Sequence, residues 1–151
     1  MNNPNISIRP YDAATDIKIL SAIWLDASRH AHAFIGEERL LEQQKLIEKV
    51  YLPKAETTVA CLGSEPAGFI SLLGNFIGGL FVAPMHQGRG IGRRLVAHAL
   101  EEKGELSLEV YLDNAQAVGF YKRLGFRELS RRPVDDQGLP FANALMHLAK
   151  D

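Results

Sequence analysis

Apolar residues recur along the chain with two different periods, and the changes of period mark its predicted elements. From residue 16 to 31 they recur every three or four positions, which predicts an amphipathic helix. Its apolar side consists of Leu20, Ile23, Trp24, Ala27 and Ala31. A second helix is expected after Gly36, with Pro53 closing it. The residues expected to face inward on this helix are Leu40, Leu41, Ile47 and Val50.

The middle of the chain changes to an extended pattern. Residues 57–62 and 67–73 are rich in apolar and β-branched side chains and flank a turn at 63–66, so they predict a hairpin. After Gly74-Asn75 a further strand is expected at 76–82, which gives a meander. A short strand at 6–8, stopped by Pro10, precedes the first helix.

The two periods alternate in the last third of the chain. A helix is predicted over 91–102, with a buried stripe of Leu95, Val96, Ala99 and Leu100. Strict alternation over 106–112 predicts a strand. Asn114 is placed to cap a helix that ends at Gly125. Residues 126–132 and 141–148, with a turn at 135–138, predict a closing hairpin.

The predicted order is therefore β-α-α-β-β-β-α-β-α-β-β. This order describes an α/β (α+β) protein with a mixed, mostly antiparallel sheet of seven strands and four helices. One parallel β-α-β step is expected across the glycine-rich loop after Pro84. The length of 151 residues and the lack of a linker pattern favour a single domain over residues 1–151.

The composition excludes several classes of function. Seventeen Lys and Arg residues balance eighteen Asp and Glu residues, so the basic excess typical of a nucleic-acid-binding domain is missing. No apolar run approaches the roughly 20 residues of a membrane span, and no secretory signal pattern is present. The lone Cys61 cannot form an intramolecular disulfide and reads as a buried small residue, and a cytoplasmic protein is expected. No interface pattern distinguishes a monomer from a homodimer.

The loop between Pro84 and Leu95 carries the clearest chemical signal. Glycines between a strand and a helix let backbone N–H groups converge on one anion, and the positive end of the helix dipole adds to their field. Arg89, Arg93 and Arg94 oppose that dipole unless an anion binds there. The loop therefore predicts a phosphate site. A Walker A loop is excluded, because no Lys-Ser or Lys-Thr follows the glycines.

A dinucleotide-binding loop is a second interpretation. Gly88-x-Gly90 follows a strand, and Glu109 lies about 20 residues on, where an acid for a ribose is expected. Arg93 occupies the third glycine position, however, and Glu109 lies inside a strand. These departures make a nicotinamide-dependent enzyme the weaker hypothesis.

A third interpretation rests on two motifs. Gln87, Gly90 and Gly92 form a Gln-x-x-Gly-x-Gly pattern after Leu80-x-Val82-x-Pro84. Downstream comes the pattern Asn114-x-x-Ala117-x-x-Phe120-Tyr121-x-x-Leu124-Gly125-Phe126. Together they resemble the GNAT superfamily of acyl-CoA-dependent N-acyltransferases, and the predicted order of elements is that of the GNAT fold. Around Trp24, His32 and Phe34, and again at 134–140, the chain resembles a YjaB-type subgroup of small bacterial members.

The resemblance implies a set of coenzyme-binding residues for acetyl-CoA. Backbone groups of the strand before the loop would face the pantetheine arm, at Leu80, Phe81 and Val82. Backbone amides would hold the pyrophosphate, at Gln87, Gly88, Arg89, Gly90, Ile91, Gly92 and Arg93. Asn114 would contact the pantetheine, cap its helix, or do both. Gly78-Gly79 suits either close approach of a ligand or a bulge in the strand.

The resemblance also implies that Tyr121 protonates the departing thiolate of the coenzyme. A thiol pKa near 8.5 and a phenol pKa near 10 allow this donation. The alternative is that Tyr121 only packs beside Phe120 and Phe126. The group that removes the amine proton is open between Glu109, His32 and His86, and the strand before the loop has no acid. His30-x-His32 has no third ligand at metal-binding spacing, so no metal site is expected.

The implied activity is transfer of an acetyl group from acetyl-CoA to a primary amine by direct attack. The acceptor is a small molecule or a peptide. Residues 16–50 and the hairpin around 135–141 are expected to wall its pocket, and Asp135 and Asp136 to attract a cationic amine. A module that binds acyl-CoA without catalysis is the competing class of function.

Overall fold

A computed structural model describes residues 5–150, and its elements follow the predicted order. The strands are β1 (Ile6–Pro10), β2 (Glu56–Leu62), β3 (Glu65–Leu73), β4 (Phe76–Val82), β5 (Glu105–Tyr111), β6 (Arg127–Arg132) and β7 (Asn143–Ala149). The helices are α1 (Ile17–Ala31), α2 (Glu37–Leu46), α3 (Leu52–Lys54), α4 (Ile91–Lys103) and α5 (Ala115–Leu124). Short 3-10 turns lie at η1 (Ala33–Ile35) and η3 (Pro84–His86), and a π-helical segment η2 (Ile47–Tyr51) joins α2 to α3. The α2–η2–α3 stretch is the second predicted helix, so the predicted fold class is confirmed.

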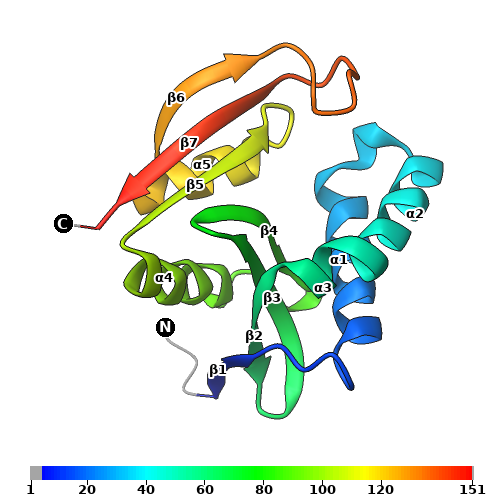
Figure 1. Cartoon of the computed structure of the whole chain (residues 1–151), viewed down its shortest axis with the longest axis vertical. Coiled ribbons are helices and arrows are strands. Elements are labelled where there is room, and N and C mark those ends of the chain that lie inside the picture. The colour runs from blue at the N-terminus through cyan, green and yellow to red at the C-terminus, as the bar shows by residue number, and fades with distance from the viewer. Residues whose placement is uncertain (1–4, 151) are drawn as a thin grey trace.

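The seven strands form one sheet in the order β1-β2-β3-β4-β5-β7-β6. Every neighbouring pair is antiparallel except β4 and β5, which are parallel. These two strands pair only at Phe76 with Ser107 and at Ile77 with Leu108. Beyond this point they diverge, and Figure 1 shows the resulting V between the green and the yellow strand. The backbone of β4 from residue 78 onward therefore has a paired strand only on its β3 side.

Two apolar cores lie on the two faces of the sheet. One packs α4 and α5 against strand side chains such as Ile70, Leu106 and Leu108. The other packs α1 and α2 against side chains such as Phe69 and Val59. Neighbouring residues of β3 face opposite cores, as the alternation of a strand requires. The helices of Figure 1 accordingly cover both faces, and the V opens between the two layers.

The predicted inward face of the second helix is only partly right. Leu40 is buried and Ile47 is half-buried, but Leu41 and Val50 are exposed, and Leu52 is the second buried anchor. For Val50 the reason is the π-helical segment η2 just before Pro53, whereas Leu41 lies on the solvent side of the regular helix α2. Proline has no N–H for the carbonyl four residues earlier, and i→i+5 bonding widens the turn. The wider turn brings Leu52 to the buried side and turns Val50 outward.

Gly78 is the extra residue of a β-bulge in β4. Ser71 of β3 is opposite Gly79, while the next residue, Leu72, is opposite Ile77. The Gly78-Gly79 pair thus forms a bulge, and close approach of a ligand to the same pair stays a prediction. The bulge lies where β4 leaves β5, next to the opening of the V. Among the described residues, no helix has the length and apolar character that crossing a membrane requires.

Candidate functional site

A cavity of about 850 Å³ occupies the V between β4 and β5. The glycine-rich loop and the start of α4 line one end, and α1, η2 and α3 line the opposite face. Because the strands have separated here, the cavity connects the two faces of the sheet. Groups from both halves of the chain can therefore meet in it.

The glycine loop presents an uncapped helix N-terminus to this cavity. Gly88 and Gly90 have φ angles of 81° and 84°, a backbone region that favours glycine, and Gly90 is the N-cap of α4. No side chain caps the helix, and its first turn contains no acidic residue. The first helical bond runs from the amide of Arg94 to the carbonyl of Gly90. The amides of Ile91, Gly92 and Arg93 are thus free to bind an anion, and the helix dipole favours one.

The predicted coenzyme residues lie almost entirely along this cavity. Its walls include Leu80, Phe81, Val82, Gln87, Gly88, Gly90, Ile91, Gly92, Arg93, Asn114 and Tyr121. Arg89 does not line the cavity and is exposed to solvent. The Gln87 side chain donates a hydrogen bond of 3.2 Å to the carbonyl of Val82, which ties the loop to the end of β4.

Tyr121 on α5 lies between Phe120 and Phe126, with ring centroids 5.2 and 5.3 Å away. It is buried, and burial raises the pKa of its phenol above the usual value of 10. The ring also lines the cavity. The phenol is therefore protonated at neutral pH and adjoins the space where a ligand would lie.

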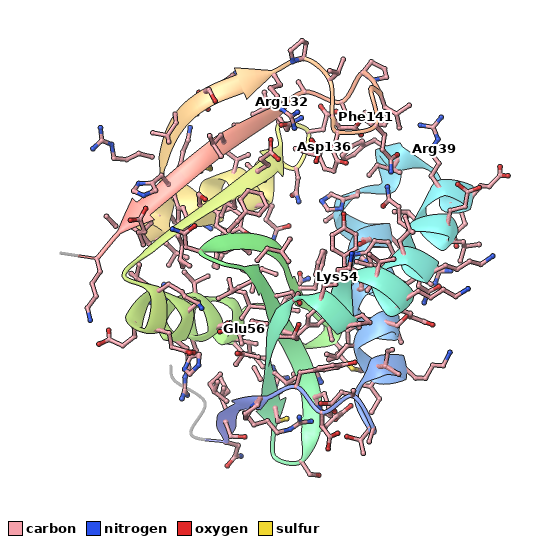
Figure 2. All side chains as sticks on the ribbon, in the orientation of Figure 1. Arg39, Lys54, Glu56, Arg132, Asp136 and Phe141 are labelled. Carbon is pink, nitrogen blue, oxygen red and sulfur yellow. The ribbon has the colours of Figure 1, made fainter. Side chains whose placement is uncertain are left out.

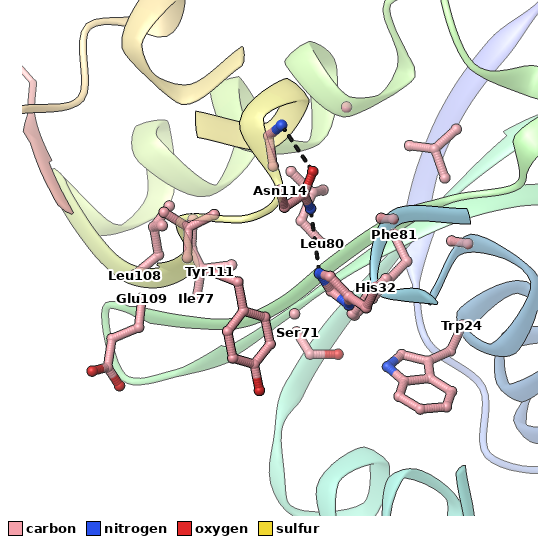
Figure 3. A pocket seen from close by; sticks show the side chains of 18 of the residues that line it. Trp24, His32, Ser71, Ile77, Leu80, Phe81, Leu108, Glu109, Tyr111 and Asn114 are labelled. Carbon is pink, nitrogen blue, oxygen red and sulfur yellow. Dashed lines mark hydrogen bonds between the residues drawn. The ribbon is translucent and has the colours of Figure 1, made fainter. Parts of the chain in front are cut away.

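Asn114 links α5 to the other half of the molecule. Its Oδ1 accepts a hydrogen bond of 3.2 Å from the amide of Ala117, which confirms the predicted N-cap. Its Nδ2 donates to Nε2 of His32 over 3.3 Å, and dashed lines in Figure 3 mark both bonds. Burial lowers the pKa of His32 to about 4. His32 is therefore neutral at pH 7, and its acceptor nitrogen is engaged by Asn114.

Glu109 lies on β5, on the side of the strand that carries Tyr111 rather than the core leucines. Its carboxylate accepts a hydrogen bond of 2.6 Å from Arg132, whose guanidinium also donates to Asp136 over 2.9 Å. Figure 2 shows Arg132 and Asp136 beside each other at the loop between β6 and β7. All three residues line the cavity. Glu109 and Asp136 thus share one guanidinium at this end, while Asp135 accepts hydrogen bonds from the backbone amides of its own turn.

An aromatic cluster supports this end of the cavity. Tyr111 has edge contacts with His32 at 5.3 Å, with Phe34 at 5.4 Å and with Phe141 at 6.2 Å. Its hydroxyl donates to Asp135 over 3.4 Å, and burial with this carboxylate raises its pKa to about 12. Sequence reasoning assigned no role to Tyr111 and included Phe141 only as the end of the hairpin expected to wall the acceptor pocket. The available signal was the position of Tyr111 on the polar side of its strand.

A buried pair of hydroxyls lies where β2 and β3 back the cavity. Thr57 and Ser71 are cross-strand neighbours whose side-chain oxygens are 2.8 Å apart, and only Ser71 lines the cavity. If Ser71 donated to Thr57, the Thr57 hydroxyl would need another acceptor in an apolar layer, at a cost of about 1–3 kcal/mol. The favoured arrangement has Thr57 donating, which leaves the Ser71 hydroxyl free to donate into the cavity.

His86 also lines the cavity, but neither ring nitrogen has a hydrogen-bond partner within residues 5–150. His30 lies apart, with Nδ1 3.0 Å from the carbonyl of Asp26. Across the described part of the chain, no three His, Cys, Asp or Glu side chains are grouped closely enough to hold a metal ion. Cys61 is a free, buried thiol in β2.

Comparison with known proteins gives consistent matches. The sequence model of the acetyltransferase (GNAT) family matches residues 18–126. Peptidyl-lysine N-acetyltransferase YjaB of Escherichia coli K12 is 40% identical over 131 residues, which are 86% of this chain and 87% of YjaB. The solution structure of apo YjaB from E. coli matches with a TM-score of 0.85 and 38% identity, over 94% of this chain and 96% of that one. The PaiA N-acetyltransferase of Thermoplasma acidophilum, solved with coenzyme A, shares the fold with a TM-score of 0.77 at 20% identity, over 96% and 99% of the two chains.

Proposed function

The chain belongs to the acetyltransferase (GNAT) family of N-acetyltransferases, and we propose that it transfers acetyl from acetyl-CoA directly to the ε-amine of a lysine in a peptide. One observation supports this most strongly. A single cavity joins the free amides of α4 to a buried phenol and to a carboxylate on β5. The peptidyl-lysine acceptor follows the activity named for YjaB.

The loop and β4 supply the groups that would hold the coenzyme, whose thioester provides an activated acetyl group. The free amides of 91–93 fit a pyrophosphate, with the Arg93 side chain beside them in the cavity wall. The β4 backbone at 80–82 has no strand on its β5 side, so it can bond to the amides of a pantetheine arm. Backbone N–H groups near Phe81 and Val82 would stabilise the oxyanion that forms on attack.

The acceptor amine has to lose a proton before it attacks. With a pKa near 10.4, only about one amine in a thousand is neutral at pH 7, which costs roughly 4–5 kcal/mol. We assign the proton acceptor to Glu109, directly or through one water, because its carboxylate borders the cavity. His32 is the weaker candidate, since Asn114 occupies its single acceptor nitrogen, whereas a carboxylate bonded to Arg132 keeps further lone pairs for a proton.

Tyr121 then donates its phenol proton, or a hydrogen bond, to the thiolate that leaves. The amine, after giving one proton to Glu109, forms the N–C bond and the oxyanion. The C–S bond then breaks as the carbonyl re-forms, Tyr121 gives its proton to sulfur, and the second proton that the nitrogen loses restores the phenol. Burial keeps the phenol protonated until this step. The contribution of such a general acid is about 10²–10⁴ in rate.

Thiol release from acetyl-CoA with a lysine peptide tests the proposal. Tyr121→Phe and Glu109→Gln are each expected to lower kcat by about 10²-fold or more, with acetyl-CoA binding retained. Tyr11→Phe and Glu105→Gln are matched controls, because neither residue lines the cavity. Full kcat in both test variants would refute the assigned roles. Binding of acetyl-CoA without turnover in the wild type, with any amine, would favour the non-catalytic binding module.

A further inference from the structure

Three exposed apolar side chains border the cavity on its α2–α3 side. Leu46 ends α2, Tyr51 ends η2 and Leu73 ends β3, and their exposed fractions are 46%, 46% and 44%. All three line the cavity. We call them the apolar rim. Neither the proposed coenzyme site nor the proton-transfer groups use them.

Among the residues of the helical wall next to the rim, those that line the cavity include no charged side chain. Its cavity-lining residues between α2 and β2 are Gln43, Leu46, Ile47, Tyr51, Leu52 and Ala55. The π-helical turn before Pro53 is what leaves Tyr51 and its neighbour Val50 facing outward. Apolar side chains grouped at the mouth of a cavity, instead of scattered over the surface, indicate a binding surface.

The end of the cavity near the loop between β6 and β7 is acidic instead of apolar. Glu109 and Asp136 share the guanidinium of Arg132, and Asp135 accepts a hydrogen bond from the Tyr111 hydroxyl. Three carboxylates and one guanidinium therefore line this end of the cavity, which leaves an excess of negative charge. This end favours an ammonium group over a carboxylate. An acceptor that makes favourable contacts with both the acidic end and the apolar rim therefore carries a cation together with an apolar group. A small polyamine or an amino sugar would leave the rim in contact with water.

We propose that the acceptor is a peptide in which an apolar side chain lies next to the target lysine and docks on the apolar rim. This inference rests on the proposed function, because it names the sequence around the lysine that the same site acetylates. The rim is continuous with the cavity in which the ε-amine must meet the thioester. A neighbouring leucine, methionine or phenylalanine side chain extends the contact of the lysine stem along this wall.

Two peptides of equal length and charge test the inference, one with leucine and one with serine on both sides of a single lysine. The expected result is a kcat/KM about tenfold or more higher for the leucine peptide, the size of discrimination that an apolar pocket provides. In a Leu46→Ser/Tyr51→Ser variant the preference should fall to within about twofold, through a higher KM for the leucine peptide. The rim residues are exposed, so the variant should fold, and its circular dichroism and thermal midpoint check this.

Leu129→Ser is the matched control, because Leu129 is 58% exposed on β6 and does not line the cavity. This variant should keep the full preference. Equal kcat/KM for the two peptides in the wild type would overturn the inference and leave the proposed function intact. Acetylation of neither peptide would also overturn it, and butylamine in the same assay then decides whether the proposed function falls as well. A preference that survives in the rim variant would contradict the assignment of the rim.

Discussion

Replacing His32 by glutamine should change how stability depends on pH. Burial holds the pKa of His32 at about 4 in the folded chain, against 6.5 for an unperturbed histidine. Between these values the unfolded chain binds a proton that the folded chain does not. The wild type therefore loses stability as the pH falls from 6.5 towards 4, whereas a glutamine at this position cannot titrate.

The size of the effect follows from the two pKa values. At pH 5 the unfolded histidine is almost fully protonated and the folded one is about nine-tenths neutral, which destabilises the wild type by about 2 kcal/mol relative to pH 8. Carboxylates with lowered pKa values, such as Asp16 and Glu48, titrate below this range. His30→Gln is the control, because His30 is exposed and lies only two residues away.

Urea denaturation at pH 8 and pH 5 measures the difference. The account predicts that the pH-dependent loss is about 2 kcal/mol smaller in His32→Gln than in the wild type, and unchanged in His30→Gln. Equal losses in the wild type and in His32→Gln would refute the reasoning that His32 is buried and neutral.

Three further outcomes are expected. Asp16→Ala removes a carboxylate that accepts two bonds from Arg9, at 2.7 and 2.8 Å, and should lower the free energy of unfolding by about 3 kcal/mol and the thermal midpoint by about 6–12 °C. A drop below 2 °C would show that the ion pair is unimportant. Gly92→Val places a Cβ 3.2 Å from the ring of Phe120 and should weaken acetyl-CoA binding about tenfold or more, which calorimetry checks; unchanged affinity would exclude this contact from the site. His86→Phe removes two buried nitrogens without partners and should leave the urea midpoint unchanged or raise stability by up to about 1 kcal/mol, whereas a clear loss would mean that the imidazole has a partner.

Local signals carried most of what the sequence could predict. The order of the elements, the glycine loop and the cap at Asn114 each depend on residues a few positions apart, where periodicity and turn chemistry act. Gly125 ends α5 with a φ of 105°, as a helix-terminating glycine should. The residues proposed to hold the coenzyme lie in such local motifs, and the resemblance of these motifs to the GNAT superfamily is what allowed them to be named from the sequence.

The acceptor half depends on contacts that no local pattern encodes. Asn114 and His32 are 82 positions apart, and Phe34, Tyr111 and Phe141 come from three separate segments. The π-helical turn also interrupts the regular helical period, so Val50, which was predicted to face inward, is exposed instead. Which of these side chains contact one another depends on how the two halves of the chain pack across the V.

The central claim is that the coenzyme binds at the glycine loop, and calorimetric titration with acetyl-CoA tests it most directly. Gly90→Trp blocks the loop, and Gly104→Trp is its control, because both glycines have positive φ and terminate the same helix at opposite ends. The account predicts saturable binding to the wild type and to Gly104→Trp, and none to a folded Gly90→Trp variant. Unimpaired binding to Gly90→Trp, or no binding to the folded wild type, would contradict it.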